Sequence, residues 1–292
     1  MIISASYRTD IPAFYADWLT ARLAAGFCEV TNPYNGKPHR VSLTPQDARA
    51  FVFWTRNAGP LMPELMRLSA ARRPFSVSFT IIGYPRQIDR RVIPVGQAIE
   101  QIRQLARLHP RCVVWRYDPI LLTDITTPDW HEKNFSDLSG RLKGFCDEVT
   151  VSFATFYRKT ERNLKQQLAT EGIGWRDPST DEKQQMFRRL AGIAAGNGQQ
   201  LTVCSQPELV TPGVAPARCI DTARLSAIAG RDIAGRTKGN RPGCLCAESR
   251  DIGAYDSCPH GCVYCYAVRS RPAALDNWHR HDPALPGLIP TR

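Results

Sequence analysis

Short apolar runs alternate with amphipathic stretches along most of the chain, and this alternation predicts its secondary structure. Apolar runs of about four to eight residues, several of them bounded by Gly, Pro, Asn or Asp, predict buried strands. We expect strands at residues 2–6, 27–31, 50–54, 75–82, 112–117, 148–153 and 200–204. Apolar positions three and four residues apart predict helices at residues 14–25, 61–71, 96–108, 130–143 and 181–195. Thr44 with Pro45 also predicts a helix start, and Asp181 is the expected N-cap of the last helix.

Strands that alternate with helices predict an α/β protein with a parallel sheet. The near-equal units within residues 2–204 favour a (β/α) TIM-like barrel, partial or full, over a flat dinucleotide-binding sheet. No G-x-G-x-x-G motif follows the first strand, which agrees with this choice. We expect residues 1–210 to form the barrel body and residues 211–292 to form a Cys-rich segment packed on it, within a single integrated domain.

The chain is basic, with 38 Lys and Arg against 27 Asp and Glu and a formal net charge of +11. This charge favours nucleic acid, nucleotides or other phosphorylated molecules as partners, although dispersed basic residues are also typical of a solvated surface. No apolar run is long enough to cross a bilayer, and residues 1–8 lack the pattern of a signal peptide. We therefore expect a cytoplasmic protein that makes no membrane contact.

The 10 cysteines are unevenly distributed. Cys28, Cys112 and Cys146 are isolated beside expected strands, which is typical of buried apolar residues. The others all follow residue 200, and clustered cysteines in a reducing compartment more often bind metal than form disulfides. This asymmetry predicts metal chemistry in the last third of the chain.

Three cysteines lie close together in the segment Cys258-Pro-His-Gly-Cys262-Val-Tyr-Cys265. The C-x3-C-x2-C spacing suits three corners of an iron–sulfur cube and leaves the fourth iron without a protein ligand. A tetrahedral zinc site would need a fourth ligand to close it. His260, between Pro259 and Gly261, is expected to form local hydrogen bonds or to border a ligand rather than to bind metal.

The three-cysteine motif resembles the cluster loop of radical S-adenosylmethionine (SAM) enzymes. With Tyr266 and Ala267 it is most similar to the spore-photoproduct-lyase-like branch. The resemblance implies that Cys258, Cys262 and Cys265 hold a [4Fe–4S] cluster whose open iron binds SAM. It also implies reductive cleavage of SAM to a 5′-deoxyadenosyl radical, an electron donor such as flavodoxin or ferredoxin, and a (β/α) barrel.

The position of the motif departs from that superfamily, where the cluster loop usually follows the first strand. Circular permutation would explain the difference, with residues 252–257 forming the strand before the loop and lying beside residues 2–6. The Gly-Gly-Glu segment that helps to hold SAM in that superfamily is not found in the sequence.

Over nearly its whole length the chain also resembles an uncharacterised bacterial family, domain of unknown function 1848. The strings that carry this resemblance are Ser4-Ala-Ser-Tyr-Arg-Thr-Asp10, Asn32-Pro-Tyr34, Phe53-Trp-Thr55, Trp115-Arg-Tyr-Asp-Pro119 and Asp251-Ile-Gly253. This second resemblance implies no activity.

Residues just past the carboxyl ends of barrel strands line the active site, which predicts where the ligands would bind. The residues expected to bind the cofactor are Arg8, Asp10, Asn32, Tyr34 and Arg56, with Tyr264 of the cluster loop. Those expected to be catalytic are Arg116, Tyr117 and Asp118. Arginines would bind carboxylate or phosphate groups, and aspartates would accept hydrogen bonds from ribose hydroxyls. A tyrosine would supply a hydrogen atom or stack on adenine.

Four further cysteines follow residue 200: Cys204, Cys219, Cys244 and Cys246. Four thiolates are enough to complete a tetrahedral zinc site or to ligate every iron of a second four-iron cluster. Cys244 and Cys246 would face the same side of an extended segment. We expect at least three of the four to bind an auxiliary cluster or zinc. The alternatives are a pair of buried thiols with two further cysteines that help the first site, or a strained Cys-x-Cys redox pair.

Three functions therefore remain open at this point. The first is a radical SAM enzyme acting on an unknown substrate, with a nucleotide or nucleic acid favoured by the charge. The second is a non-catalytic zinc or iron–sulfur module that binds nucleic acid, in which metal binding would be part of folding. The third is an iron–sulfur oxidoreductase that transfers electrons without SAM.

Overall fold

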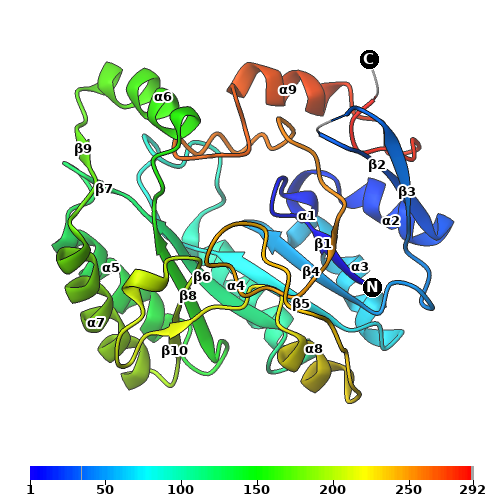
Figure 1. Ribbon diagram of the computed structural model, residues 1–292, viewed down its shortest axis with the longest axis horizontal. Coiled ribbons are helices and arrows are strands. Elements are labelled where there is room, and N and C mark those ends of the chain that lie inside the picture. Colours follow the sequence, from blue (N-terminus) through cyan, green and yellow to red (C-terminus); the bar gives the residue numbers. More distant parts are fainter. Residues whose placement is uncertain (34, 291–292) are drawn as a thin grey trace.

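The computed structural model describes residues 1–33 and 35–290, and its centre is one sheet of eight strands (Figure 1). Every neighbouring pair in this sheet is parallel. In spatial order the strands are β12 (Arg250–Asp251), β1 (Ile2–Ala5), β4 (Ala50–Thr55), β5 (Phe75–Thr80), β6 (Val113–Ile120), β8 (Glu148–Phe153), β10 (Gln200–Val203) and β11 (Ala215–Pro216). The strand nearest the C-terminus therefore lies beside the first strand of the chain.

The sheet is open, because the edge strands β11 and β12 do not pair with each other. Each of these edge strands is only two residues long, so neither presents enough backbone to close a barrel. The full barrel allowed by the sequence pattern is therefore wrong. One parallel α/β sheet nevertheless includes strands from residues 1–210 and from residues 211–292.

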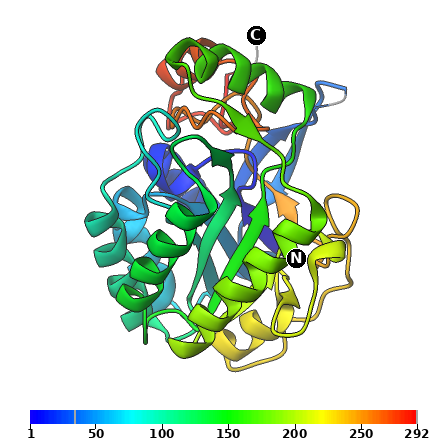
Figure 2. The same ribbon diagram turned by 90° about the vertical axis from the view of Figure 1, so that its left-hand side faces the viewer.

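The two faces of the sheet differ, because successive strand residues point to opposite sides. One face carries large, fully buried side chains such as Phe53, Phe79 and Trp115, which belong to the main hydrophobic core. Helices cover this face, which we call the outer face (Figures 1 and 2). They are α2 (Ala16–Ala25), α3 (Met62–Ala70), α4 (Val95–Leu108), α5 (Pro128–Arg141) and α7 (Thr180–Gly196).

The opposite, inner face carries mainly small or hydroxylated side chains, including Ser4, Ser78, Thr150 and Thr202. A second, smaller apolar cluster covers part of it, where Leu225 of α8 (Thr222–Ala229) packs with residues of β1 and β4. The last third of the chain thus crosses the inner face before it reaches β12 (Figure 2).

The carboxyl end of the sheet is covered by α6 (Arg158–Gln167), α9 (Arg271–His279) and the segment between β12 and α9 (Figure 1). The short helix α1 (Ile11–Phe14) follows β1 at the same end. Two pairs of strands lie outside the central sheet: β2 (Phe27–Thr31) with β3 (Pro38–Ser42), and β7 (Leu122–Thr123) with β9 (Trp175–Arg176). None of the helices in the described residues is long and apolar enough to span a membrane.

Most predicted elements are confirmed to within a few residues, with four corrections. The strand before the cysteine loop is Arg250–Asp251, whereas residues 252–257, where it was expected, form no strand. The strand at Phe27–Thr31 exists, but it forms an antiparallel hairpin and is not a unit of the parallel sheet. Residues 44–47 form a turn and not a helix. The cap of α7 is Ser179, which forms a reciprocal capping box with Glu182 and so displaces Asp181 into the first turn.

Candidate iron–sulfur and thiol site

Loops from four adjacent strands meet at the carboxyl end of the sheet. The segment after β12 carries Cys258, Cys262 and Cys265, and the loops after β1, β4 and β5 pack around it. A direct backbone connection joins the segment to the β5 loop, where Val263 N–H donates to Ile88 O (3.1 Å). This arrangement follows from the parallel sheet, because parallel strands place all their carboxyl ends on one edge.

The cysteine loop is compact and internally hydrogen-bonded. Gly261 has φ of +74°, a conformation that side chains rarely tolerate, and Cys265 N–H donates to Cys262 O (3.1 Å). Burial raises the pKa of the Cys258 thiol to about 12, and it raises the pKa of Cys262 and Cys265 as well. Each thiol pair interacts electrostatically, so the three sulfurs lie near one another.

Backbone N–H groups oppose the effect of burial at two of these thiols. Those of His260 and Asp10 lower the pKa of Cys258, and those of Ala267 and Val268 lower the pKa of Cys265. N–H donation to thiolate sulfur is one of the means by which proteins stabilise iron–sulfur clusters and set their potentials.

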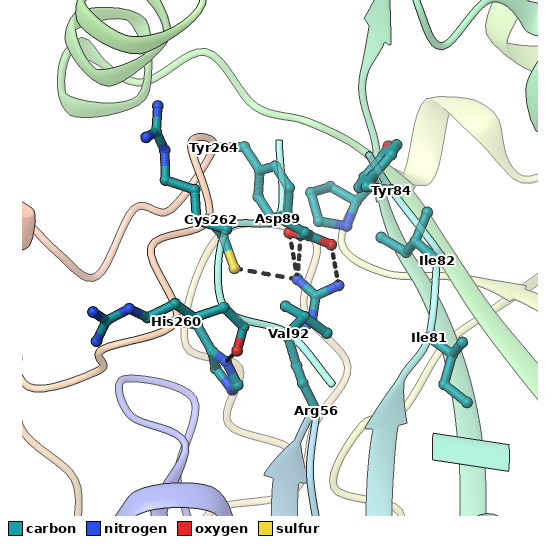
Figure 3. Close-up of polar contacts among 12 residues, drawn as sticks. Arg56, Ile81, Ile82, Tyr84, Asp89, Val92, His260, Cys262 and Tyr264 are labelled. Carbon is teal, nitrogen blue, oxygen red and sulfur yellow. Dashed lines mark hydrogen bonds and ion pairs between the residues drawn. The ribbon is translucent and has the colours of Figure 1, made fainter. Parts of the chain in front are cut away.

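Arg56, at the end of β4, donates to the third sulfur (Figure 3). Its Nη1 lies 3.2 Å from Cys262 Sγ and 2.9 Å from Asp89 Oδ1, while Nη2 binds Asp89 Oδ2. Tyr264 accepts from the same guanidinium and donates to Asp89 Oδ1 (2.8 Å). Burial alone would lower the pKa of Arg56, but Asp89, Tyr264 and Cys262 raise it well above its usual range. Arg56 is thus a fixed positive charge beside Cys262.

Asp89 is the residue of this group that the sequence analysis missed. It lies in the long loop between β5 and α4, several residues beyond the strand end where we looked. It is 3% exposed and forms a single antiparallel bridge with Cys262. Its signal in the sequence was only an acidic residue between Ile88 and two arginines.

Asp10 connects the cluster loop to β1 and β4. Its carboxylate accepts hydrogen bonds from Thr55 Oγ1 (2.7 Å), the Arg56 backbone N–H (2.7 Å) and His260 Nε2 (2.8 Å). It also caps α1 by accepting a hydrogen bond from the Ala13 N–H. His260 also packs edge-on against Phe14, with ring centroids 4.6 Å apart. His260 therefore anchors the cysteine loop, in agreement with the local hydrogen bonding expected for it.

Arg8 joins β1 to β12. Its Nε and Nη2 each lie 2.9 Å from Asp251 Oδ1, and both side chains are nearly fully buried. Ser4 and Ser6 also donate to this carboxylate. The structure thus gives Arg8 a partner within the protein and places it at the junction that precedes the cysteine loop.

Of the two other residues expected to bind the cofactor, Asn32 is not brought to this group. Asn32 follows β2 and hydrogen-bonds within the turn of the β2–β3 hairpin, outside the parallel sheet. Tyr34 lies outside the described residues.

The three residues expected to be catalytic separate onto opposite faces of β6. Tyr117 is fully buried on the outer face, where its hydroxyl lies 2.8 Å from His131 Nδ1 and 3.0 Å from Asn134 Nδ2 of α5. Arg116 and Asp118 form an ion pair on the inner face, and Ser152 donates to Asp118. The alternation of a strand explains the split, since residue 117 must point away from residues 116 and 118.

The four remaining late cysteines come together on the inner face beside Arg116. Cys204 Sγ and Cys219 Sγ are 3.6 Å apart, Cys219 interacts with Cys246, and Cys246 with Cys244. Arg116 Nη1 donates to Cys219 Sγ (2.9 Å). The hydrogen bond from Cys246 lowers the pKa of Cys244 to about 6. Cys28, Cys112 and Cys146 are buried elsewhere, as expected.

In the described part of the chain, no group of three or more His, Cys, Asp or Glu side chains is arranged so that it could hold a single metal ion. A [4Fe–4S] cluster does not require this, because each thiolate binds its own iron and inorganic sulfide bridges the irons. Three partly buried thiols on one loop, with the Arg56 guanidinium 3.2 Å from the Cys262 sulfur, therefore fit such a cluster by their donor chemistry. A single ion at the other four cysteines would require those sulfurs to draw closer.

Fold and site together define an α/β protein with an open, all-parallel sheet and a three-cysteine loop at its carboxyl edge. The chain belongs to the family described as Domain of unknown function (DUF1848), whose model matches residues 2–267. No curated protein and no solved structure matches the chain.

Proposed function

We propose that this protein is a radical SAM-type iron–sulfur enzyme built on a circularly permuted, partial (β/α) barrel. The observation that carries the proposal is the place of the three-cysteine loop directly after β12. If β12 counts as the first strand, then β1, β4, β5, β6, β8, β10 and β11 follow in the same order in space and along the chain. The cysteine loop then follows the first strand, as in the superfamily that its motif resembles.

Cys258, Cys262 and Cys265 would hold a [4Fe–4S] cluster, with SAM at the iron that has no protein ligand. When bound, the cluster would pass one electron from a donor such as flavodoxin or ferredoxin to SAM, breaking its C5′–S bond to give methionine and a 5′-deoxyadenosyl radical. The three cysteines are partly buried, which limits the access of water to this place, as a carbon radical requires.

The side chains around the loop would have separate tasks. Arg56 and Asp89 fix Tyr264 and place a positive charge beside Cys262, and Asp10 with His260 fixes the other half of the loop. Arg116 and Asp118, on the inner face, would meet the substrate. A nucleotide or another phosphorylated substrate agrees with the net charge of +11.

Electron paramagnetic resonance of anaerobically reconstituted, reduced protein, with and without SAM, tests the proposal. We expect a four-iron signal that changes when SAM is added, and 5′-deoxyadenosine as a product. Cys262→Ala should lose both, while Cys112→Ala, which removes an isolated buried thiol, should keep both.

The other outcomes would identify the alternatives. A reversible iron–sulfur signal that SAM leaves unchanged would favour an electron-transfer protein. Zinc in place of iron at the three-cysteine loop, with unfolding on chelation and binding to nucleic acid, would favour a non-catalytic module.

A further inference from the structure

The structure points to a separate metal centre at Cys204, Cys219, Cys244 and Cys246, and we propose that it is a tetrahedral zinc site. The four residues come from three segments: Cys204 follows β10, Cys219 follows β11, and Cys244 and Cys246 lie in the stretch before β12. Folding has brought together thiols up to 42 positions apart in sequence, on the inner face of the sheet.

The spacing of the sulfurs favours one ion over a cluster. Zinc binds thiolates at about 2.3 Å, so the sulfurs of a tetrahedral site are about 3.8 Å apart. Cys204 Sγ and Cys219 Sγ are separated by 3.6 Å, and Cys219 and Cys244 pack against the same small apolar cluster as Cys246. In a four-iron cluster each thiolate binds its own iron at a different corner of a cube, so the ligand sulfurs need not approach one another so closely.

Positive charge and N–H donors surround these thiols. Four thiolates around Zn²⁺ leave two net negative charges, which a buried site must compensate. Arg116 Nη1 lies 2.9 Å from Cys219 Sγ, and Arg241 Nη2 lies 3.4 Å from Cys204 Sγ. The Ile220 N–H donates to Cys246 Sγ (3.4 Å). Two guanidinium groups are therefore in place, although Arg116 shares its charge with Asp118.

Closing the tetrahedron requires the two ends of this row of thiols, Cys204 and Cys244, to approach each other. Cys204 is held at the end of β10, whereas Cys244 follows an exposed turn and is only half-buried. A Cβ on Gly239 would lie 2.2 Å from Cys244 O, so the turn already passes as close as glycine allows. Cys244 is therefore the ligand that would move when the ion binds.

Such a centre would fasten the last third of the chain to the inner face. It would tie the turn that carries Cys244 to β10 and β11 and would orient Arg116 through Cys219. The site does not depend on iron at the three-cysteine loop, so the two proposals stand or fall separately.

Zinc and iron contents of the purified full chain, measured together, test the inference. In the triple variant Cys258→Ser, Cys262→Ser and Cys265→Ser, we expect about one zinc per chain and no iron. In the variant Cys219→Ser with Cys246→Ser, we expect zinc to be lost while iron at the other loop remains. Cys146→Ser, at an isolated buried thiol, is the matched control and should keep both metals.

Cobalt provides a measurement that does not need the second variant to fold. Co²⁺ added to the zinc-depleted triple variant should give the intense visible bands of a tetrahedral thiolate complex, and zinc should abolish them. Iron in place of zinc in the triple variant would overturn the proposal in favour of an auxiliary cluster. Binding of neither zinc nor cobalt would overturn it in favour of free thiols.

Discussion

Arg56 donates to the sulfur of Cys262 across 3.2 Å, and it does so from the carboxyl end of a different strand. The same guanidinium forms a bidentate ion pair with Asp89, and both side chains are more than nine-tenths buried. A charge buried beside a thiol is costly unless it is paired, so the three groups depend on one another.

Arg56→Met should therefore lower the free energy of unfolding by about 3–5 kcal/mol, because it leaves the Asp89 carboxylate buried with Tyr264 as its remaining partner. Urea unfolding measures the change. Arg67→Met is the matched control, since Arg67 pairs with Glu64 on the surface and should cost less than about 1 kcal/mol. Equal losses in the two variants would contradict the structural role of Arg56.

His260→Ala should loosen the cysteine loop from β1 and β4. It removes one donor from the buried Asp10 carboxylate, at a cost of about 1–3 kcal/mol, and it removes the ring that packs on Phe14. We expect lower stability in urea and less iron after reconstitution. His39→Ala, at an exposed position of β3, should change neither quantity. Normal stability and iron content in His260→Ala would show that Asp10 does not need this partner.

Tyr117→Phe should reduce stability and leave SAM cleavage intact. The hydroxyl hydrogen-bonds to His131 and Asn134 on the outer face. Losing it leaves the buried His131 Nδ1 without this partner, at about 1–3 kcal/mol, whereas Asn134 Nδ2 keeps its hydrogen bond to Ile82 O. Thermal unfolding and 5′-deoxyadenosine formation, measured on the same preparation, separate the two effects. A variant of normal stability that no longer cleaves SAM would restore the catalytic role predicted from the sequence.

His131 should make the protein less stable as the pH falls from about 6.5 to about 4. Burial lowers its pKa from 6.5 to about 4, so in this interval the unfolded chain binds a proton that the folded chain does not. The effect amounts to roughly 3 kcal/mol across the interval. Unfolding free energies of the protein and of His131→Gln, measured over this range, should differ in slope. Parallel curves would mean that His131 does not remain neutral in the folded state.

The strands could be predicted from two patterns: a continuous apolar run, as in Ala50–Thr55, and apolar residues that alternate with hydroxylated ones, as in Phe75–Thr80. The hairpin of Phe27–Thr31 could not be distinguished from such a strand, since its partner Pro38–Ser42 is mostly polar and exposed. Register with a neighbour, and not composition, decides which sheet a strand joins.

The site was harder to predict than the fold. The cysteines and Arg56 could be named because they lie in a motif or directly after a strand. Asp89 could not be predicted, because it lies far along the loop after β5 and reaches Cys262 only through the path of that loop. Tyr117 was assigned to the site from its position after Arg116, although the alternation of a strand sends neighbours to opposite faces.

The pairing of β12 with β1 also determines when the cysteine loop can be completed in a growing chain. β1 and β4 both precede Cys258 by about 200 residues or more, so they can pair before the cysteine loop is synthesised. The greater part of the core can therefore form first, since chains tend to fold from the N-terminal side during synthesis. Acquisition of a cofactor at the loop would then come last, on a scaffold already assembled, and translation itself would delay it until the rest of the sheet is in place.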